Sequence, residues 1–264
     1  MDSTVVKAFS LLEVLAESEE PLGVTELADR LSFGKSNVHR LLQTLIALNY
    51  VRKTDGAGYM ATLRMWEFGS RIVSRVVLRD IARPTMRHLS SLTKEAVHLS
   101  QYDAGEVIYL DKIESKEPVR AYTQLGGRAP AYCTATGKIL MAYIPEAEVR
   151  QVYEGVQAST RNTVTDVEVF LQQCATARDR RYALNTGEWR EDVIGLAAPI
   201  ADASGAVVSA IGISAPASRL GPDAIERFAP ELVEAGREVS RRLGCSVGQW
   251  QQLGGEHEAL TADV

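Results

Sequence analysis

Residues 22–53 read LGVTELADRLSFGKSNVHRLLQTLIALNYVRK, and this stretch decides the fold of the first part of the chain. Its apolar residues recur at three- and four-residue steps in two runs, which predicts two short amphipathic helices. The small residue Ala28 lets the second helix pass close to the first. Residues 32–34 are too few for anything but a turn, in which Gly34 is expected to supply backbone freedom. This spacing is typical of a helix-turn-helix, whose second helix enters the DNA major groove.

The outward face of the second helix carries polar side chains that are long enough to reach base edges and phosphates. Residues 30–54 contain five Lys or Arg and only neutral or apolar side chains besides, although acids outnumber bases in the whole chain. A polyanionic partner requires such a window. The alternative is a solvated helical hairpin whose composition arose by chance. The candidate DNA-binding residues of this helix are Lys35, Ser36, Asn37, His39, Arg40 and Gln43.

A β-hairpin is predicted directly after this helix. Residues 50–53 and 59–61 have the composition of short strands, and residues 55–58 between them form a Gly-rich turn signal. A helix-turn-helix followed by a hairpin is a winged helix. Arg52 and Lys53 then lie at the base of the wing, where they are candidates for phosphate contact. The alternative is an ordinary edge strand, since edge strands favour Lys and Arg.

Length and charge indicate two domains with different partners. The chain has 264 residues and a net charge of −5, shared as +2 over residues 1–93 and −7 over residues 94–264. We find no apolar run of 18 residues and no signal-peptide pattern, so we expect a protein with no membrane segment. Cys133, Cys174 and Cys245 are scattered without a CxxC motif, which favours a reducing cytoplasm and predicts no metal site.

Periodicity gives a coarse order of elements for the rest of the chain. A helix over residues 4–18 should pack on the two helices of the helix-turn-helix. A broadly apolar helix over 63–79 is interpreted as a linker that also pairs with a partner chain, and another helix, about 82–94, should begin near Pro84. The later helices are expected from 136 onward and at 146–154, 166–180 and 222–243. The strands are expected at 97–103, 107–114, 120–122, 182–184, 193–200 and 206–215, with a loop from 126 to 134. The last two strands are apolar on both faces, so helices should cover the sheet.

This order of parts resembles the IclR family of bacterial transcription regulators over residues 4–243. Four segments carry the resemblance together: SNVHRLLQTLIALNYV (36–51), WEFG (66–69), GGRAPAYCTATGKILMA (126–142) and AAPIADASGAVVSAIGISAPASRL (197–220). The resemblance implies an α+β chain in four parts. They are a winged helix-turn-helix DNA-binding domain (1–61), a linker helix (62–80), a GAF- or profilin-like α/β effector-binding domain (81–246) and a tail (247–264), which its Gly- and Gln-rich composition predicts to be disordered.

The resemblance also implies partners and a ligand site. The expected partners are operator DNA, a small organic acid and further copies of the chain in a dimer or tetramer, without a cofactor. The helix that begins near residue 136 should present its N-terminus to a carboxylate. The candidate effector-binding residues are Arg128, Tyr132, Thr134, Ala135, Thr136, Asn185, Trp189, Gly212 and Ser214. Each has a structural alternative: helix capping for residues 134–136, satisfaction of a strand edge for Ser214, simple packing for Trp189, and support of its own loop for Arg128.

Two positions depart from the family pattern. Gly195 stands where many members carry Cys, and Gly212 where many carry Ser. Two smaller side chains suggest a roomier pocket, and hence an aromatic or longer acid.

Three functions from different classes compete at this point. A ligand-responsive regulator is favoured, as a repressor ahead of an activator. An enzyme is disfavoured, because the phosphate-loop echo at residues 136–138 lacks Gly at position 132 and Ser or Thr at 139, and Cys133 has no His near it in sequence. A DNA-binding scaffold that only oligomerises is the third reading. It differs from the first in showing no response to small molecules.

Overall fold

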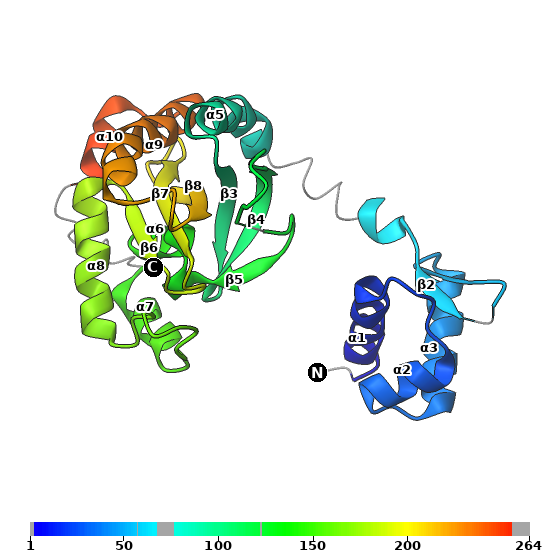
Figure 1. The fold of residues 1–264 in the computed structure, drawn as a ribbon. Helices are drawn as coiled ribbons and strands as arrows, with labels where there is room; N and C mark the ends of the chain where they lie inside the picture. The colour runs from blue at the N-terminus through cyan, green and yellow to red at the C-terminus, as the bar shows by residue number, and fades with distance from the viewer. Residues whose placement is uncertain (1–2, 57, 68–76, 122, 255–264) are drawn as a thin grey trace. The chain divides into compact units, whose positions relative to one another are not determined.

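The computed structural model describes residues 3–56, 58–67, 77–121 and 123–254 (Figure 1). The chain divides into two compact units, residues 1–76 and 77–264. Among the described residues, no helix is both long enough and apolar enough to span a bilayer.

The first unit is a winged helix, as predicted. Its elements are α1 (Ser3–Glu17), α2 (Val24–Leu31), α3 (Lys35–Ala47), β1 (Val51–Lys53) and β2 (Tyr59–Ala61). The three helices share one core, in which Leu11, Leu27 and Leu42 are fully buried. Strands β1 and β2 pair in antiparallel fashion and form the wing.

The turn between α2 and α3 differs from the prediction in one residue. Ser32, with φ 55°, takes the left-handed conformation that ends α2, whereas Gly34 has an ordinary extended backbone. The prediction about Gly34 is therefore wrong, because the reversal falls at the C-cap of α2 rather than next to α3. Ala28 is buried in the core that α2 and α3 share, and its carbonyl accepts a hydrogen bond from Phe33 N at 2.9 Å.

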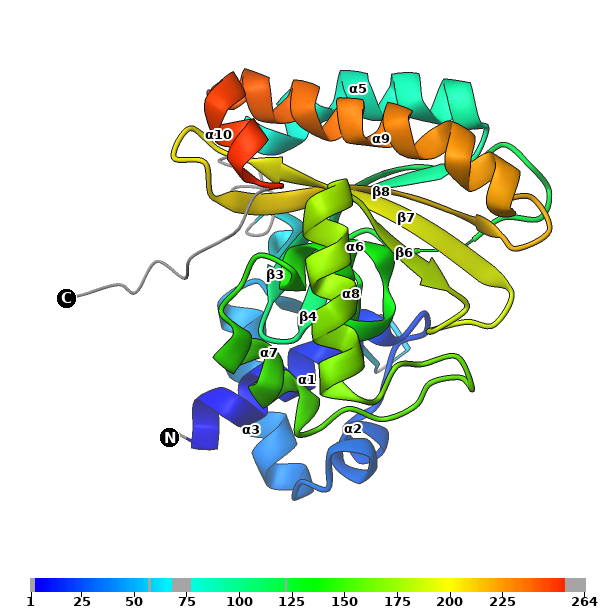
Figure 2. The ribbon, with the colours of Figure 1, turned by 90° about the vertical axis from the view of Figure 1, so that its left-hand side faces the viewer.

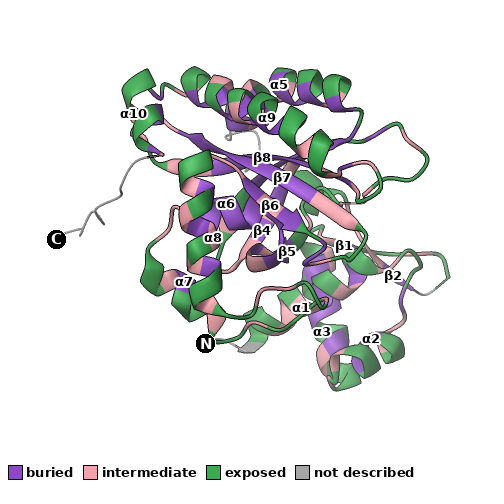
Figure 3. Ribbon diagram, turned by 60° about the vertical axis from the view of Figure 1, so that its left-hand side comes forward, coloured by how far each residue is buried: buried purple, intermediate pink, exposed green. Residues whose placement is uncertain are grey.

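The second unit is built on a six-stranded antiparallel sheet in the order β5-β4-β3-β8-β7-β6. Helices cover both of its faces (Figure 2), as the apolar strands predicted. On one face lie α5 (Val77–Thr93) and α9 (Pro222–Arg242); on the other lie α6 (Ala135–Met141), α7 (Glu146–Tyr153) and α8 (Val167–Arg180). The strands are β3 (Ala96–Asp103), β4 (Glu106–Ile113), β5 (Arg128–Pro130), β6 (Ala183–Thr186), β7 (Val193–Ala201) and β8 (Val207–Pro216). Figure 3 shows the buried residues gathered on the sheet and on the helix faces toward it.

Helix α5 begins earlier than expected. It starts at Val77 and contains Pro84, so the prediction that a helix begins near Pro84 is wrong. An interior proline removes one backbone hydrogen bond. Tertiary contacts outweigh that loss here, because Ala82 and Met86 are fully buried. Of the predicted linker helix, residues 64–67 are helical, 68–76 lie outside the described residues and 77–80 open α5.

The edge of the sheet also differs from the prediction. Residues 120 and 121 are not in a strand, and residue 122 lies outside the described residues. Residues 128–130, expected in a loop, instead form β5 against β4. Three residues that end in a proline carry little strand signal, yet a proline is tolerated in a short edge strand, where one side needs no partner.

The segment after residue 246 is partly ordered, so the predicted disordered tail is wrong for its first part. Residues Val247–Gln252 form α10, which opens with a capping box between Ser246 and Gln249. Trp250 is buried in a small cluster with Cys245 and Leu253. A glycine- and glutamine-rich composition hid this capping signal and the burial of Trp250. Residues 255–264 lie outside the described residues.

Replacing Trp250 by alanine tests the role of α10. We expect Trp250→Ala to lower the free energy of unfolding of the second unit by about 3 kcal/mol, because it empties a buried aromatic site. Chemical denaturation measures this change. Val247→Ala, at a side chain that is 63% exposed on the same helix, is the control and should change little. Equal, small effects of both variants would contradict the packing of α10.

Candidate DNA-binding helix and effector cavity

Helix α3 presents one apolar and one polar face. Val38, Leu41, Leu42 and Leu45 are buried toward the core of the first unit. The predicted DNA-binding residues occupy the opposite face: Lys35, Ser36, His39, Arg40 and Gln43 are exposed, and Asn37 is half-buried. The structure therefore leaves these side chains available to a ligand along the helix.

The wing adds two cations to this unit. Arg52 and Lys53 are both exposed on β1, and Arg52 Nη2 lies 3.7 Å from the Sδ atom of Met60 across the hairpin. Gly58 permits the wing to lie against the chain before α2, since a Cβ atom there would come within 2.5 Å of the Pro21 side chain. The wing is thus held by packing rather than by its turn alone.

The second unit contains a cavity of about 50 Å³ between α6 and the sheet. Four kinds of segment form its walls: the first turn of α6, strands of the sheet, the segment between β4 and β5, and the loop between β6 and β7. The lining residues are His98, Tyr109, Ala121, Thr123, Thr134, Ala135, Thr136, Asn185, Trp189, Arg190, Val193, Gly195, Leu196, Gly212, Ile213 and Ser214. Seven of the nine predicted effector-binding residues are among them.

The structure places the other two predicted residues, Arg128 and Tyr132, outside the cavity. Pairing of β5 with β4 turns the Arg128 guanidinium to Asp103 and to Glu106, the latter at 3.0 Å. Tyr132 donates its hydroxyl hydrogen to the carbonyl of Gln157 at 3.0 Å. Both predictions are corrected accordingly: Arg128 supports its own loop, and Tyr132 fastens the segment after α7.

His98 is a cavity residue that the sequence analysis missed. Its Nε2 lies 2.6 Å from Ser214 Oγ, and its Nδ1 lies 3.1 Å from Thr123 Oγ1. Burial, and secondarily the charge of Lys112, lower the pKa of His98 to about 4, so the ring is neutral at pH 7. Only cross-strand pairing with Gly212 brings His98 to the cavity, and a sequence window of β3 contains no sign of that pairing.

Arg190 supplies the positive charge at the cavity. Its guanidinium stacks on Trp189, with Cζ 4.9 Å from the ring centroid. No ion pair within the described residues involves this guanidinium. An exposed cation at the wall of a cavity is suited to an anionic group of a ligand. The signal available in sequence was its place next to Trp189, which was a predicted site residue.

The glycines of the cavity have a different role from the one expected. A Cβ atom on Gly212 would lie 2.7 Å from Thr136 Cγ2, and one on Gly195 would lie 3.2 Å from Ala135 Cβ. The missing side chains therefore accommodate α6 rather than a ligand. The interpretation of these glycines as extra room is wrong for this structure, because the space is filled by the close approach of the helix.

The alternative of a catalytic cysteine finds no support in the geometry. Cys133 is buried, and burial raises the pKa of its thiol to about 12, so the thiol stays protonated. Lys138, the lysine of the phosphate-loop echo, is bound to Glu188 in the interior. Within the described residues, no group of His, Cys, Asp and Glu is placed to hold a metal ion.

A winged helix with an exposed face free of acidic side chains, joined in one chain to a sheet that encloses a small cavity, is the architecture of a ligand-responsive DNA-binding regulator. Sequence profiles agree with this class. The IclR helix-turn-helix domain matches residues 4–55, and the C-terminal domain of bacterial IclR transcriptional regulators matches residues 70–241. The chain therefore belongs to the IclR family. The relatives that it matches are transcriptional regulators and not enzymes.

Individual relatives cover nearly the whole chain. The HTH-type transcriptional regulator KdgR of Escherichia coli (strain K12) is 36% identical over 245 residues, which span 92% of this chain and 93% of that protein. The crystal structure of the Thermotoga maritima IclR matches with a TM-score of 0.77 at 29% identity, over 92% of this chain and all of that one.

A second solved structure resembles this chain in fold. It is an IclR homolog complexed with 4-hydroxybenzoate, from Microbacterium hydrocarbonoxydans, with a TM-score of 0.81 at 22% identity over 91% of this chain and 99% of that one.

The buried, neutral His98 predicts a pH dependence of stability. Its pKa is about 4 in the folded protein against 6.5 when unfolded, so its contribution is complete above pH 6.5 and is lost as the pH falls toward 4. Relative to His98→Gln, the wild type should lose about 3 kcal/mol of unfolding free energy over that interval. Denaturation of both proteins at several pH values measures the difference, in which other titrating groups cancel. Parallel curves for the two proteins would contradict a buried neutral imidazole.

Proposed function

We propose that this regulator is a repressor that binds operator DNA as a dimer or tetramer and releases it when a small organic acid enters the cavity of the second unit. The observation that carries the proposal is the cavity itself, whose wall combines the Arg190 cation with buried hydroxyl groups. An activator that uses the same two sites is the second candidate. A scaffold without a ligand is the third.

The chemistry of the cavity favours a carboxylate attached to an aromatic or longer body. Arg190 can bind the carboxylate, and the hydroxyls of Thr123 and Ser214 can exchange hydrogen bonds with a polar substituent. The rings of Tyr109 and Trp189 offer apolar surface. The 4-hydroxybenzoate in the similarly folded homolog supports an acid of this kind. A cavity of about 50 Å³ must widen to admit it, since ligand sites usually measure hundreds of Å³.

Self-association is supported by apolar surface on the first unit. Helix α1 exposes Val5, Val6 and Phe9, by 53%, 44% and 59% respectively. Three neighbouring large apolar side chains on one exposed helix are typical of an interaction surface. The proposed partner is a second copy of the chain, because a two-fold dimer presents two α3 helices to half-sites one DNA turn apart.

The proposed mechanism is a coupling free energy between cavity and operator. An acid that binds one arrangement of the protomers more tightly than another shifts the population toward that arrangement. The spacing of the paired α3 helices then changes, and with it the affinity for an operator of fixed half-site spacing. The proposed site of action is the cytoplasm, because that is where operator DNA is bound.

Arg40 tests the assignment of α3 as the DNA-binding helix. We expect Arg40→Ala to weaken operator binding by at least about tenfold, because an exposed cation on α3 that contacts phosphate or guanine is lost. Fluorescence polarisation on DNA from the gene's own upstream region measures it, and the melting temperature should not change. Arg237→Ala, on α9 of the other unit, is the control and should bind normally. Normal binding by the Arg40 variant would show that the exposed face of α3 is wrongly assigned as the DNA-binding face.

Arg190 tests the effector site, and Arg128 provides a matched control. The probes are 4-hydroxybenzoate, pyruvate and glyoxylate, titrated into the protein–DNA complex. We expect the aromatic acid to release DNA, and Arg190→Met to need about tenfold more of it while binding DNA normally in its absence. Arg128→Met, whose side chain lies outside the cavity, should respond like the wild type.

The acid panel also separates the alternatives. Release only by pyruvate or glyoxylate would contradict the aromatic ligand class. Tighter DNA binding or activation of transcription with acid would favour the activator. Unchanged DNA affinity and stability with every acid would favour the scaffold.

A further inference from the structure

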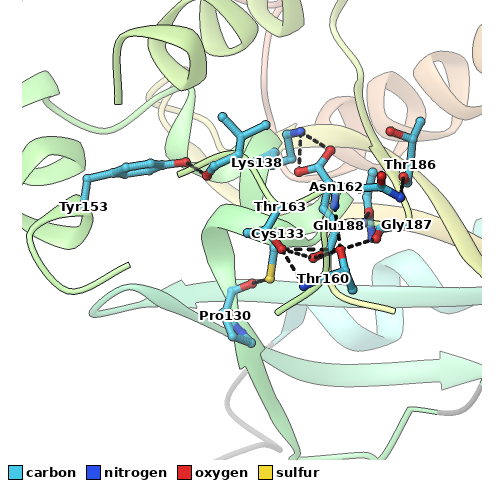
Figure 4. Close-up of polar contacts among 12 residues, drawn as sticks. Pro130, Cys133, Lys138, Tyr153, Thr160, Asn162, Thr163, Thr186, Gly187 and Glu188 are labelled. Carbon is cyan, nitrogen blue, oxygen red and sulfur yellow. Dashed lines mark hydrogen bonds and ion pairs between the residues drawn. The ribbon is translucent and has the colours of Figure 1, made fainter. Parts of the chain in front are cut away.

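An ion pair lies in the interior of the second unit, outside the cavity lining. Lys138 Nζ is 2.6 Å and 2.8 Å from the two carboxylate oxygens of Glu188, and the side chains are only 6% and 5% exposed (Figure 4). Lys138 belongs to α6, directly after the turn that forms one wall of the cavity. Glu188 directly precedes Trp189 and Arg190, which also line the cavity. The pair therefore joins two segments that contribute to the cavity wall.

Glu188 is also held through its backbone. Its N–H donates to the side-chain oxygen of Asn185, a cavity residue, at 2.8 Å. Its carbonyl accepts hydrogen bonds from the hydroxyls of Thr160 at 3.1 Å and Thr163 at 2.6 Å. Figure 4 shows Thr160 and Thr163, which belong to the segment after α7, beside Glu188. Side chain, N–H and carbonyl are thus each fixed by a different part of the fold.

The turn at Gly187 restricts the same loop. Its φ of +77° lies in the left-handed region, and a Cβ atom there would come within 2.6 Å of the Glu191 carbonyl. The Gly187 carbonyl accepts a further hydrogen bond from Thr160 Oγ1 at 2.7 Å. These contacts hold residues 187 and 188. The contacts of Glu188 therefore determine the direction in which the chain continues through residues 189 and 190.

Stability alone does not account for a buried charge pair. Two ions must lose their hydration, and apolar pairs of similar volume are often as stable or more stable. The outer side of this pair borders a groove of about 440 Å³ between α8 and β6, where Lys138 and Glu188 both line the wall. An apolar pair at positions 138 and 188 would pack here equally well. It would not fix the direction of the side chain at position 188 as the ion pair does.

We propose that Lys138 and Glu188 are positioning residues that hold the Trp189–Arg190 wall in register with α6 and so determine the affinity for the effector. They do so without contacting the ligand. The inference rests on the proposed function, because it assigns these residues a role at the proposed effector cavity. One part of the inference is structural: the ion pair holds the loop of residues 187–192 also when no acid is added.

The test compares an apolar double variant with the wild type. Single variants such as Lys138→Met leave one buried charge unpaired and are expected to lose stability or fail to fold. The double variant Lys138→Met/Glu188→Leu should melt at or above the wild-type temperature. Its amides at residues 189 and 190 should nevertheless exchange hydrogen about tenfold faster, because the loop has lost its side-chain anchor. Arg150→Met/Glu146→Leu, at an exposed pair on α7, is the matched control and should leave this exchange unchanged.

A second arm uses the ligand. With 4-hydroxybenzoate as the probe, release of DNA from the double variant should need about tenfold more acid than release from the wild type. A purely structural pair would change the melting temperature and leave both the loop exchange and the acid dependence as they were, which overturns the proposal. If 4-hydroxybenzoate fails to release the wild type, the proposed effector is wrong. Hydrogen exchange then still decides whether the pair positions the loop.

Discussion

The second unit depends on how closely its helices approach the sheet. Helix α6 lies against β7 and β8 where Gly195 and Gly212 leave no side chain, and all seven of its residues are buried. On the opposite face, a Cβ atom on Gly236 of α9 would lie 2.6 Å from the Pro199 carbonyl of β7. Dense packing of this kind leaves little free space, because protein interiors have nearly crystalline density. The central strands are thus enclosed from both sides by contacts that only glycine permits.

The cavity is a consequence of this close packing and not an exception to it. A space of about 50 Å³ remains where α6 begins, and His98, Thr123 and Ser214 place polar groups in its wall. His98 bonds to the other two side chains. In the proposed function, a ligand that enters would replace these hydrogen bonds and displace a wall, and this displacement would couple ligand binding to the arrangement of the protomers.

The part of the cavity wall formed by Trp189 and Arg190 carries a positive charge. Trp189 and Arg190 follow Glu188, which is fixed by Lys138, Asn185 and two threonines. The helix α5 at the start of this unit is held independently, through a bidentate ion pair of Arg83 with Asp111 at 2.9 Å and 2.7 Å. Asp111 is only 2% exposed and pairs in register with Leu99, next to the register pair of Lys112 and His98. Strand β4 therefore links the position of α5 to that of β3, the strand whose His98 lines the cavity.

The sequence by itself determined the winged helix, the order of nearly all strands and helices in the second unit, and seven residues of the cavity wall. It could do so because apolar periodicity, turn residues and an acid-free window are local properties, and because the segment at residues 126–142 carries a specific family pattern. Tertiary structure alone decided the rest. His98 reaches the cavity through register with Gly212, Arg128 leaves it through the pairing of β5 with β4, and Trp250 orders α10 by finding an apolar cluster. Each of these outcomes depends on a contact between residues that are distant along the chain, and no local pattern records the distance between such residues.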